Sequence, residues 1–247
     1  MMDLSPETIP EEHVSQKENI IKAIVGDTYG SPDVLELRDI DKPEISDDEV
    51  LVRVHTAGVD RGVWHLMSGL PYVARLALGL RAPKNPVPGM DVAGVVEAVG
   101  GSVTRFQPGD EVFGIGKGAF AEDARAPEHK LVHKPASLTF EQAAVLAISS
   151  LTALQGLRDH GKVESGQEVL IIGASGGVGT YAVQIARAFG ARVTGVCGTA
   201  RVEMVHRRGS RHRQDVPARR GPRGHPLSRR STGQRKSRHQ RVTVNRA

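Results

Sequence analysis

The chain has 247 residues, enough for one large or two modest domains with a buried core. Its net charge of +5 is uneven: residues 201–247 hold fourteen Arg and one Lys against one Glu and one Asp, a net charge of +13, so residues 1–200 carry −8. Cys197 is the single cysteine, which excludes an intramolecular disulfide and any zinc site that needs two thiolates.

The N-terminal residues 1–19 are polar, acidic and aperiodic, and we predict that they are disordered. They lack the apolar core of a secretory signal and do not resemble a transit peptide. No segment reaches the ~20 apolar residues that a membrane helix requires. These features predict a soluble, cytoplasmic protein that has no membrane partner.

From residue 20 to about residue 134, short apolar stretches alternate with turn residues. In the stretch EVLVRVHTAG, for example, Val50, Val52 and Val54 alternate with Arg53 and His55. Such alternation, with Gly and Pro between the segments, is typical of an antiparallel, barrel-like β domain. We place this domain at residues 20–150.

The pattern changes near residue 139. Thr139 and Gln142 form a capping-box signature, and apolar residues follow at helical spacing. A buried strand at residues 169–172, a glycine loop, a helix and the strand ARVTGVC then predict a βαβ unit with a parallel strand pair. We expect a partial nucleotide-binding domain at residues 151–205, which makes the chain an α/β protein of two architectures.

The glycine loop matches a dinucleotide-binding pattern. Its candidate cofactor-binding residues are Gly173, Ala174, Ser175, Gly176, Gly177, Val178 and Gly179. Gly173 and Gly176 allow a sharp turn and a close approach to a pyrophosphate, and Gly179 allows the helix to pack on the strand. Free amides and the helix dipole would face the phosphates. A tight turn without a ligand is the alternative.

The end of the second strand indicates the choice of cofactor. A carboxylate there binds the ribose hydroxyls of NAD, whereas a cation and small hydroxyls suit the 2′-phosphate of NADP. The segment CGTAR holds no acid before Arg201 and offers Thr199 as a hydroxyl donor. NADP is therefore favoured. The alternative is that Arg201 is a solvated arginine at the start of a helix.

Several motifs resemble those of the medium-chain dehydrogenase/reductase superfamily, especially its zinc-free quinone-oxidoreductase branch. The motifs, in chain order, are GVDRGVWHLMSG, NPVPGMDVAGVVEAVG, RFQPGDEVFG, SSLTALQGL and VLIIGASGGVGTYAVQIARAFGARVTGV. The resemblance spans residues from about 20 to about 205. It implies a GroES-like antiparallel β-barrel domain followed by a Rossmann domain, and full-length relatives are expected to be homo-oligomers.

The resemblance also argues against zinc. Zinc members of the superfamily place a cysteine and a histidine where this chain has Val59-Asp60 and Gly89-Met90. A thioether and one carboxylate do not replace a thiolate and an imidazole in a tetrahedral zinc site, and the cysteine-rich structural-zinc loop is absent from the sequence. We therefore expect no zinc.

The chemistry implied by the resemblance is hydride transfer from NADPH to a polarised double bond or carbonyl. The expected substrate is a small molecule such as a quinone, an enone, an aldehyde or an alcohol. By resemblance, Thr152 lies near the nicotinamide, and Asp60, Trp64 and Tyr72 line the substrate pocket. An ordinary packing role is the alternative for Trp64. No general acid is assigned.

The tail, residues 206–247, departs from the family, which continues through a segment like LGADxVIDY. Codons that can encode HRRGSRHRQD, read one base further on, spell Ile-Gly-Ala-Asp-Arg-Val-Ile-Asp-Lys. We therefore predict that a frameshift near Val205 and His206 produced a disordered, out-of-frame, arginine-rich tail. Resequencing the gene there would decide the matter. Such a tail replaces the second half of the nucleotide-binding fold, which leaves open whether this form is active.

A non-enzymatic protein is the rival hypothesis: a folded β domain whose basic tail binds polyanions through phosphates. The tail contains no Phe, Tyr or Trp and so offers no stacking platform for single-stranded nucleic acid. We therefore expect no specific nucleic-acid partner.

Overall fold

The computed structural model describes residues 19–209 and 239–244. The chain divides into two compact units, Met1–Ile148 (unit 1) and Ser149–Ala247 (unit 2). This division lies close to the boundary near residue 150 that the sequence predicts. Residues 1–18, which the sequence predicts to be disordered, lie outside the described part of the chain.

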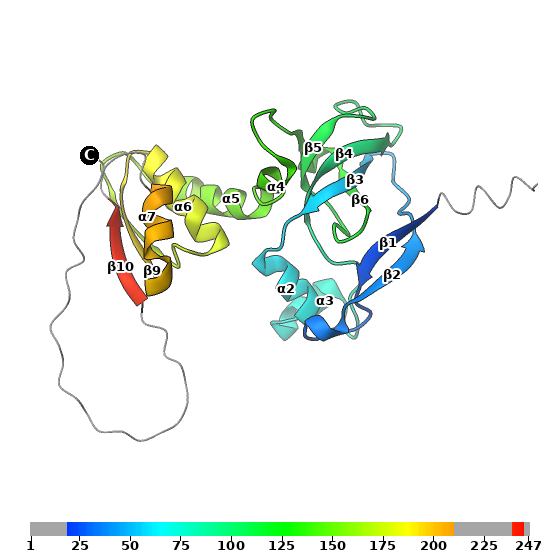
Figure 1. Ribbon diagram of the computed structural model, residues 1–247, viewed down its shortest axis with the longest axis horizontal. Helices are drawn as coiled ribbons and strands as arrows, with labels where there is room; N and C mark the ends of the chain where they lie inside the picture. The colour runs from blue at the N-terminus through cyan, green and yellow to red at the C-terminus, as the bar shows by residue number, and fades with distance from the viewer. Residues whose placement is uncertain (1–18, 210–238, 245–247) are drawn as a thin grey trace, which may run out of the picture. The chain divides into compact units, whose positions relative to one another are not determined.

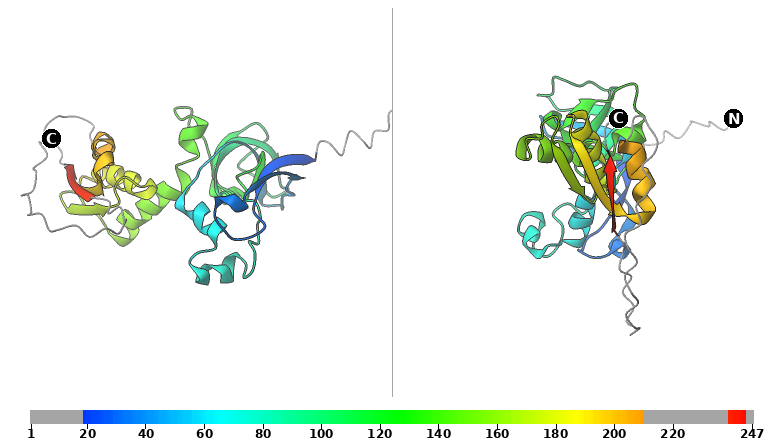
Figure 2. Two further views of the ribbon diagram at one scale, coloured as in Figure 1. Left: turned by 60° about the horizontal axis from the view of Figure 1, so that its bottom comes forward. Right: turned by 90° about the vertical axis from the view of Figure 1, so that its left-hand side faces the viewer.

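Unit 1 is built on antiparallel strands (Figure 1). Its strands are β1 (Ile20–Val25), β2 (Glu36–Asp41), β3 (Glu49–Ala57), β4 (Asp91–Val99), β5 (Glu111–Ile115), β6 (Asp123–Pro127) and β7 (Leu131–His133). β1 and β2 pair as a separate two-stranded sheet, and the others form a sheet in the order β6-β3-β4-β5-β7. Figure 2 shows that this sheet is curled. The prediction of an antiparallel, barrel-like β domain is confirmed.

The core of unit 1 lies inside the curled sheet. Val50 and Val52 of β3 are fully buried there, whereas Arg53 and His55 are exposed. Buried residues of the other strands, such as Val92 and Val112, pack against the β3 valines. The predicted alternation is therefore seen in the second half of β3, whereas Leu51 is buried together with Val50 and Val52, so both faces of the strand are covered in its first half.

Short helices lie between the strands of unit 1 and after its last strand, β7. They are η1 (Pro32–Val34), α2 (Arg61–Ser68), η2 (Tyr72–Ala74), α3 (Arg75–Leu78), η3 (Glu128–Lys130) and α4 (Phe140–Ala143). The predicted capping box begins α4: the Gln142 N–H donates to Thr139 Oγ1 at 3.3 Å, and the Thr139 N–H donates to Gln142 Oε1 at 3.1 Å. Helix α5 (Ala147–Leu154) begins at the last residues of unit 1.

Unit 2 contains the predicted βαβ arrangement. Its elements after α5 are the π-helical turn η4 (Gln155–His160), β8 (Glu168–Ile172), α6 (Gly177–Ala188), β9 (Arg192–Gly198), η5 (Thr199–Arg201), α7 (Val202–Gly209) and β10 (His239–Val244). β8 and β9 are parallel, and β10 pairs antiparallel with the other edge of β9. Val183 and Ala186 of α6 and Val193 of β9 are fully buried in one apolar cluster, so α6 covers one face of the sheet.

The segment predicted to be a disordered tail contains regular structure at two places. Helix α7 continues through Gly209, and residues 239–244 form β10. The intervening residues 210–238 and the last residues 245–247 lie outside the described part. Within the described ranges, no helix combines the length and the apolarity that crossing a bilayer would require.

Candidate functional site

The glycine loop of unit 2 joins the end of β8 to the start of α6 (Figure 1). Gly173 has a φ of +80°, in the region that favours glycine. The Gly176 N–H donates to the Gly173 carbonyl at 2.9 Å and closes a tight turn. Gly176 is also the N-cap residue of α6. The chain therefore reverses sharply at the carboxyl end of β8.

Gly179 allows α6 to begin directly against this turn. A Cβ atom added at Gly179 would lie 2.1 Å from the Gly173 carbonyl oxygen, which is far inside van der Waals contact. A Cβ atom at Gly177 would lie 3.1 Å from Ser149 Oγ. The close approach that the sequence predicts for Gly179 is thus a steric requirement of the backbone.

The outer side of the loop is open. Gly173, Gly176 and Gly177 are exposed, and apart from Gly173 and its two chain neighbours no residue has an atom within 4 Å of a Cβ built at Gly173. The N-cap residue has no side chain, so none caps the first amides of α6. These amides carry the positive end of the helix dipole. The open loop, which we call the cradle, therefore has the exposed, uncapped helix N-terminus that is typical of anion-binding sites.

The two other predicted cofactor residues of the βαβ arrangement follow β9. Thr199 and Arg201 both lie in η5 and are exposed. No Asp or Glu lies between Gly198 and Val202 in the sequence. The carboxyl end of β9 therefore presents a hydroxyl and a guanidinium and no acid, which is the chemistry that suits a 2′-phosphate.

Thr152 lies on α5 and is exposed. Ser149, three residues earlier, is buried and lies close to Gly177 at the start of α6. Residues three apart share one face of a helix, so this face of α5 is directed toward the glycine loop. Ser149 was not among the residues predicted from the sequence, although its spacing from Thr152 could have suggested it.

Asp60, Trp64 and Tyr72, the residues of unit 1 predicted to line a substrate pocket, differ in their contacts and exposure. Asp60 is the N-cap residue of α2, and its Oδ1 accepts a hydrogen bond from the Val63 N–H at 2.9 Å. Trp64 is 37% exposed, and its ring lies 4.3 Å from the Arg61 guanidinium stacked over it. Tyr72 is 72% exposed. None of the three is among the residues that line the apolar cavity of unit 1, so their predicted substrate role stays a prediction.

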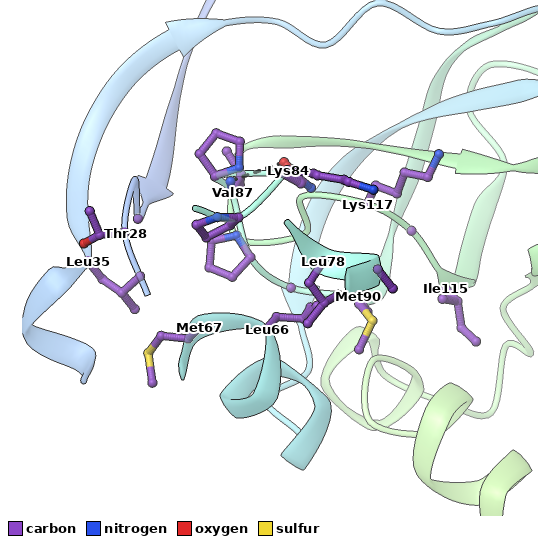
Figure 3. Close-up of a pocket in the computed structure, with 18 of the residues that line it drawn as sticks. Thr28, Leu35, Leu66, Met67, Leu78, Lys84, Val87, Met90, Ile115 and Lys117 are labelled. Atoms are coloured by element: carbon purple, nitrogen blue, oxygen red, sulfur yellow. Dashed lines mark hydrogen bonds between the residues drawn. The ribbon is translucent and has the colours of Figure 1, made fainter. Parts of the chain in front are cut away.

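That cavity has a volume of about 290 Å³ (Figure 3). In Figure 3 the labelled lining residues come from the connection between β1 and β2, from α2 and α3, from the chain between α3 and β4, from the end of β5 and from the connection between β5 and β6. Its apolar lining includes Leu35, Leu66, Met67, Leu78, Val87, Met90 and Ile115. Leu66 and Met67 come from the helix that follows Asp60 and carries Trp64. They were not predicted from the sequence, because the sequence alone did not establish which face of α2 turns inward.

Asp91, the first residue of β4, follows the lining residue Met90 and pairs with the lining residue Ile115 of β5. The residue is 2% exposed, and its Oδ1 accepts a hydrogen bond from the Ile148 N–H at 3.0 Å. Burial, and to a lesser degree the charge of Asp60, raise the pKa of Asp91 to about 6, although the hydrogen bond from Ile148 opposes the shift. The backbone of Gly58 also packs against Asp91. Asp91 therefore ties together β4, the turn before α2, and the start of α5.

The described residues contain no group of three or more His, Cys, Asp or Glu side chains arranged to hold a metal ion. Cys197 is buried in unit 2, and burial raises the pKa of its thiol. His55 stacks on Phe140 with ring centroids 4.4 Å apart. Asp60 and Met90, at the positions where zinc-binding members of the superfamily are expected to carry a cysteine and a histidine, supply a carboxylate and a thioether instead.

The fold of each unit can be compared with known proteins. Residues 46–136 match the family model for the alcohol dehydrogenase GroES-like domain. Quinone oxidoreductase of Homo sapiens is 40% identical over 186 residues, covering 74% of this chain and 54% of the relative. A mitochondrial NAD(P)H oxidoreductase of Mus musculus is 36% identical over 213 residues, covering 79% and 54%. The chain thus spans about half the length of the curated relatives it matches.

The chain is also similar to solved structures of oxidoreductases, again over part of their length. The quinone oxidoreductase from Coxiella burnetii matches with a TM-score of 0.70 and 32% identity, covering 78% of this chain and 61% of that one. A mycobacterial protein whose structure holds NADPH matches with a TM-score of 0.68 and 30% identity, covering 80% and 59%. A GroES-like β domain followed by a Rossmann-type βαβ arrangement defines a dehydrogenase-type fold. This chain belongs to the medium-chain dehydrogenase/reductase superfamily, in its quinone-oxidoreductase-like branch.

Proposed function

We propose that the chain binds NADP through the glycine loop of unit 2 and carries the cofactor and substrate elements of a zinc-free reductase. The observation that carries the proposal is the open cradle between parallel-strand β8 and helix α6, where Gly179 is sterically required and the exposed amides lack a side-chain cap. Bound NADPH would supply a hydride to a polarised double bond or carbonyl.

The residues of unit 2 have separate proposed tasks. The backbone of residues 173–179 binds the pyrophosphate, since its amides face open space at a helix N-terminus. Arg201 and Thr199 bind the 2′-phosphate, which selects NADP over NAD. Thr152 orients the nicotinamide. The NADPH held by the similar mycobacterial protein supports this assignment.

Unit 1 would hold the body of the substrate. Its cavity is mainly apolar and close to the lower limit of ordinary ligand pockets, which suits a small quinone or enone. The apolar walls would exclude water from the bound substrate and orient it. The similarity to quinone oxidoreductases and to an enoyl reductase supports this substrate class.

Two measurements on the full chain test the proposal. We expect NADPH fluorescence to rise on titration with the protein, and NADPH to be consumed when a small quinone or an enone is added. Binding of NADPH without turnover would support the cofactor site and contradict the reductase activity of this form. Absence of any NADPH binding would contradict the proposal as a whole.

The rival hypothesis, a β domain with a polyanion-binding tail, depends on residues 210–238, which lie outside the described residues. It therefore stays a prediction from the sequence. Salt-dependent retention on DNA that disappears when the residues after Arg201 are deleted would support it. Retention unchanged by that deletion would contradict it.

A further inference from the structure

We propose that the cavity of unit 1 selects an apolar ligand that carries a carboxylate. This inference rests on the proposed function, because it names the class of substrate that the cavity would take. It rests on three observations within unit 1: the size and apolar character of the cavity, the charges on its lining, and the rigid segment that carries one of its cations.

The cavity can hold a short aliphatic or cyclic body. Its volume of about 290 Å³ lies close to the lower limit of ordinary ligand pockets. Met67 and Val87 are buried in its wall, and Leu35, Leu66 and Leu78 are half-buried. Removing an apolar ligand of this size from water would supply most of its binding free energy.

The charges on the lining are all of one sign. Lys84, Lys117 and Lys130 line the cavity, and no Asp or Glu of the described chain does. Lys117 has a carboxylate nearby, since its Nζ lies 3.6 Å from Glu49 Oε1. Lys84 and Lys130 form no ion pair with any described residue. Lys84 and Lys130 therefore offer cations to which the described residues supply no matching anion.

Lys84 is carried by a stiff segment. It lies in the stretch PKNPVP, where Pro83, Pro86 and Pro88 restrict the backbone, and all three prolines line the cavity. The Asn85 side chain accepts a hydrogen bond from the Val87 N–H at 3.3 Å, which further orders the segment. Its backbone is therefore held in place before a ligand arrives, which reduces the entropy lost on binding.

An anionic group of the ligand would be attracted by the ammonium groups of Lys84 and Lys130, and a cationic group would be repelled by them. An exposed ammonium-carboxylate pair contributes little in water, but two such pairs beside an apolar wall give a measurable preference. We expect a carboxylate amphiphile to bind roughly three- to tenfold more tightly than a neutral molecule of equal length. Solvated lysines that contact no ligand would give no such preference.

Isothermal calorimetry on the full chain tests the inference with three probes of equal chain length: decanoate, decanol and decyltrimethylammonium. We expect decanoate to bind more tightly than decanol, and the cation to bind most weakly. In the double variant Lys84→Gln/Lys130→Gln the advantage of decanoate over decanol should disappear. Lys22→Gln, at an exposed lysine on β1 that pairs with Asp39, is the matched control and should retain the advantage.

A second variant tests the location. Ala77 is exposed and lines the cavity, so Ala77→Phe can fold normally and narrow the cavity. We expect it to weaken decanoate and decanol together. The arginine-rich tail is present in every variant, so a change in the decanoate advantage from one variant to another is due to the substitution and not to the tail.

Two results would overturn the inference: equal affinity of the intact chain for decanoate and decanol, or a decanoate advantage that survives the double lysine variant. Binding unchanged by Ala77→Phe would also overturn it, because the probes would then lie elsewhere. NADPH titration of the same samples separates the two proposals. NADPH binding without decanoate selectivity contradicts only this inference, whereas decanoate selectivity without NADPH binding contradicts the proposed function.

Discussion

The buried carboxylate of Asp91 accepts a hydrogen bond from the backbone N–H of Ile148 at 3.0 Å, and its pKa is raised to about 6. The carboxylate is therefore ionised at neutral pH in a place that disfavours charge. Groups of this kind are concentrated at functional sites. Asp91 contacts Gly58, in the turn before α2, and Ile148, in the first turn of α5. A change in its charge should therefore alter the stability of the contacts between β4 and these two helices.

The raised pKa predicts a pH-dependent stability. Because the folded state holds this proton more tightly than the unfolded state, the free energy of unfolding falls as the pH rises from about 4 to about 6. Asp91→Asn removes the charge and keeps an acceptor for Ile148. We expect it to stabilise the protein at pH 8 by up to about 3 kcal/mol and to change little at pH 4, as measured by urea denaturation.

Asp91→Ala provides the control for the hydrogen bond. It removes both the charge and the acceptor, so it should gain less stability at pH 8 than Asp91→Asn, and it should be destabilised at pH 4. If Asp91→Asn instead lowered stability at pH 8, the folded protein would have to stabilise the ionised carboxylate, which contradicts a raised pKa.

Gly179→Ala should destabilise unit 2. Its Cβ would lie 2.1 Å from the Gly173 carbonyl oxygen, and backbone rather than a flexible side chain would have to move. We expect a loss of about 3 kcal/mol or more, measured by chemical denaturation followed by circular dichroism. Gly198→Ala is the control, because its Cβ would have no neighbour within 4 Å. Equal stability of the two variants would contradict the close packing of α6 on the turn.

Arg201 should determine the preference for NADPH. We expect Arg201→Ala to weaken NADPH binding about tenfold, since a charge-assisted hydrogen bond to phosphate is lost, and to leave NADH binding nearly unchanged. Arg192→Ala, at an exposed arginine at the opposite end of β9, is the control and should bind both cofactors normally. If Arg201→Ala lowered the affinities for NADPH and NADH by the same factor, Arg201 would not bind the 2′-phosphate.

The outer face of β8 should favour association. Leu170 is 55% exposed and Ile172 is 77% exposed, although strands of parallel sheets are normally covered on both faces. We expect Leu170→Thr/Ile172→Thr to reduce aggregation, measured by light scattering, with little loss of stability. Ile171→Thr, at a buried position, should lose about 2 kcal/mol or more. If the double variant were destabilised as strongly, this face would have to be covered in the folded protein.

The sequence predicts the parts of this fold that depend on local patterns. Arg53 and His55 of β3 are exposed, as their alternation with the valines predicts, and the capping box at Thr139 and Gln142 begins a helix, because both features follow from backbone geometry. The glycine loop is predictable for the same reason: the sharp turn and the close approach at Gly179 need residues without a side chain.

Features that depend on tertiary packing were not predictable in this way. The inward face of α2 presents Leu66 and Met67 to the cavity, and nothing in the order of its residues distinguishes them from Trp64. Asp91 gains its raised pKa only when β4 is covered by segments distant in sequence. β10 was missed because HQRVTV has little apolar content and pairs with β9 across the undescribed residues 210–238.

The most direct test of the central claim is NADPH fluorescence titration of the full chain and of Gly176→Ala. Gly176 has a φ of −80°, and its Cβ would meet only the Gly173 carbonyl oxygen, at 3.3 Å, so the variant can fold while its methyl group enters the cradle. Gly156→Ala, with no neighbour within 4 Å of its Cβ, is the control. We predict normal binding in the control and at least about a tenfold loss in Gly176→Ala. Equal NADPH affinity in all three proteins would contradict a cofactor site at this loop.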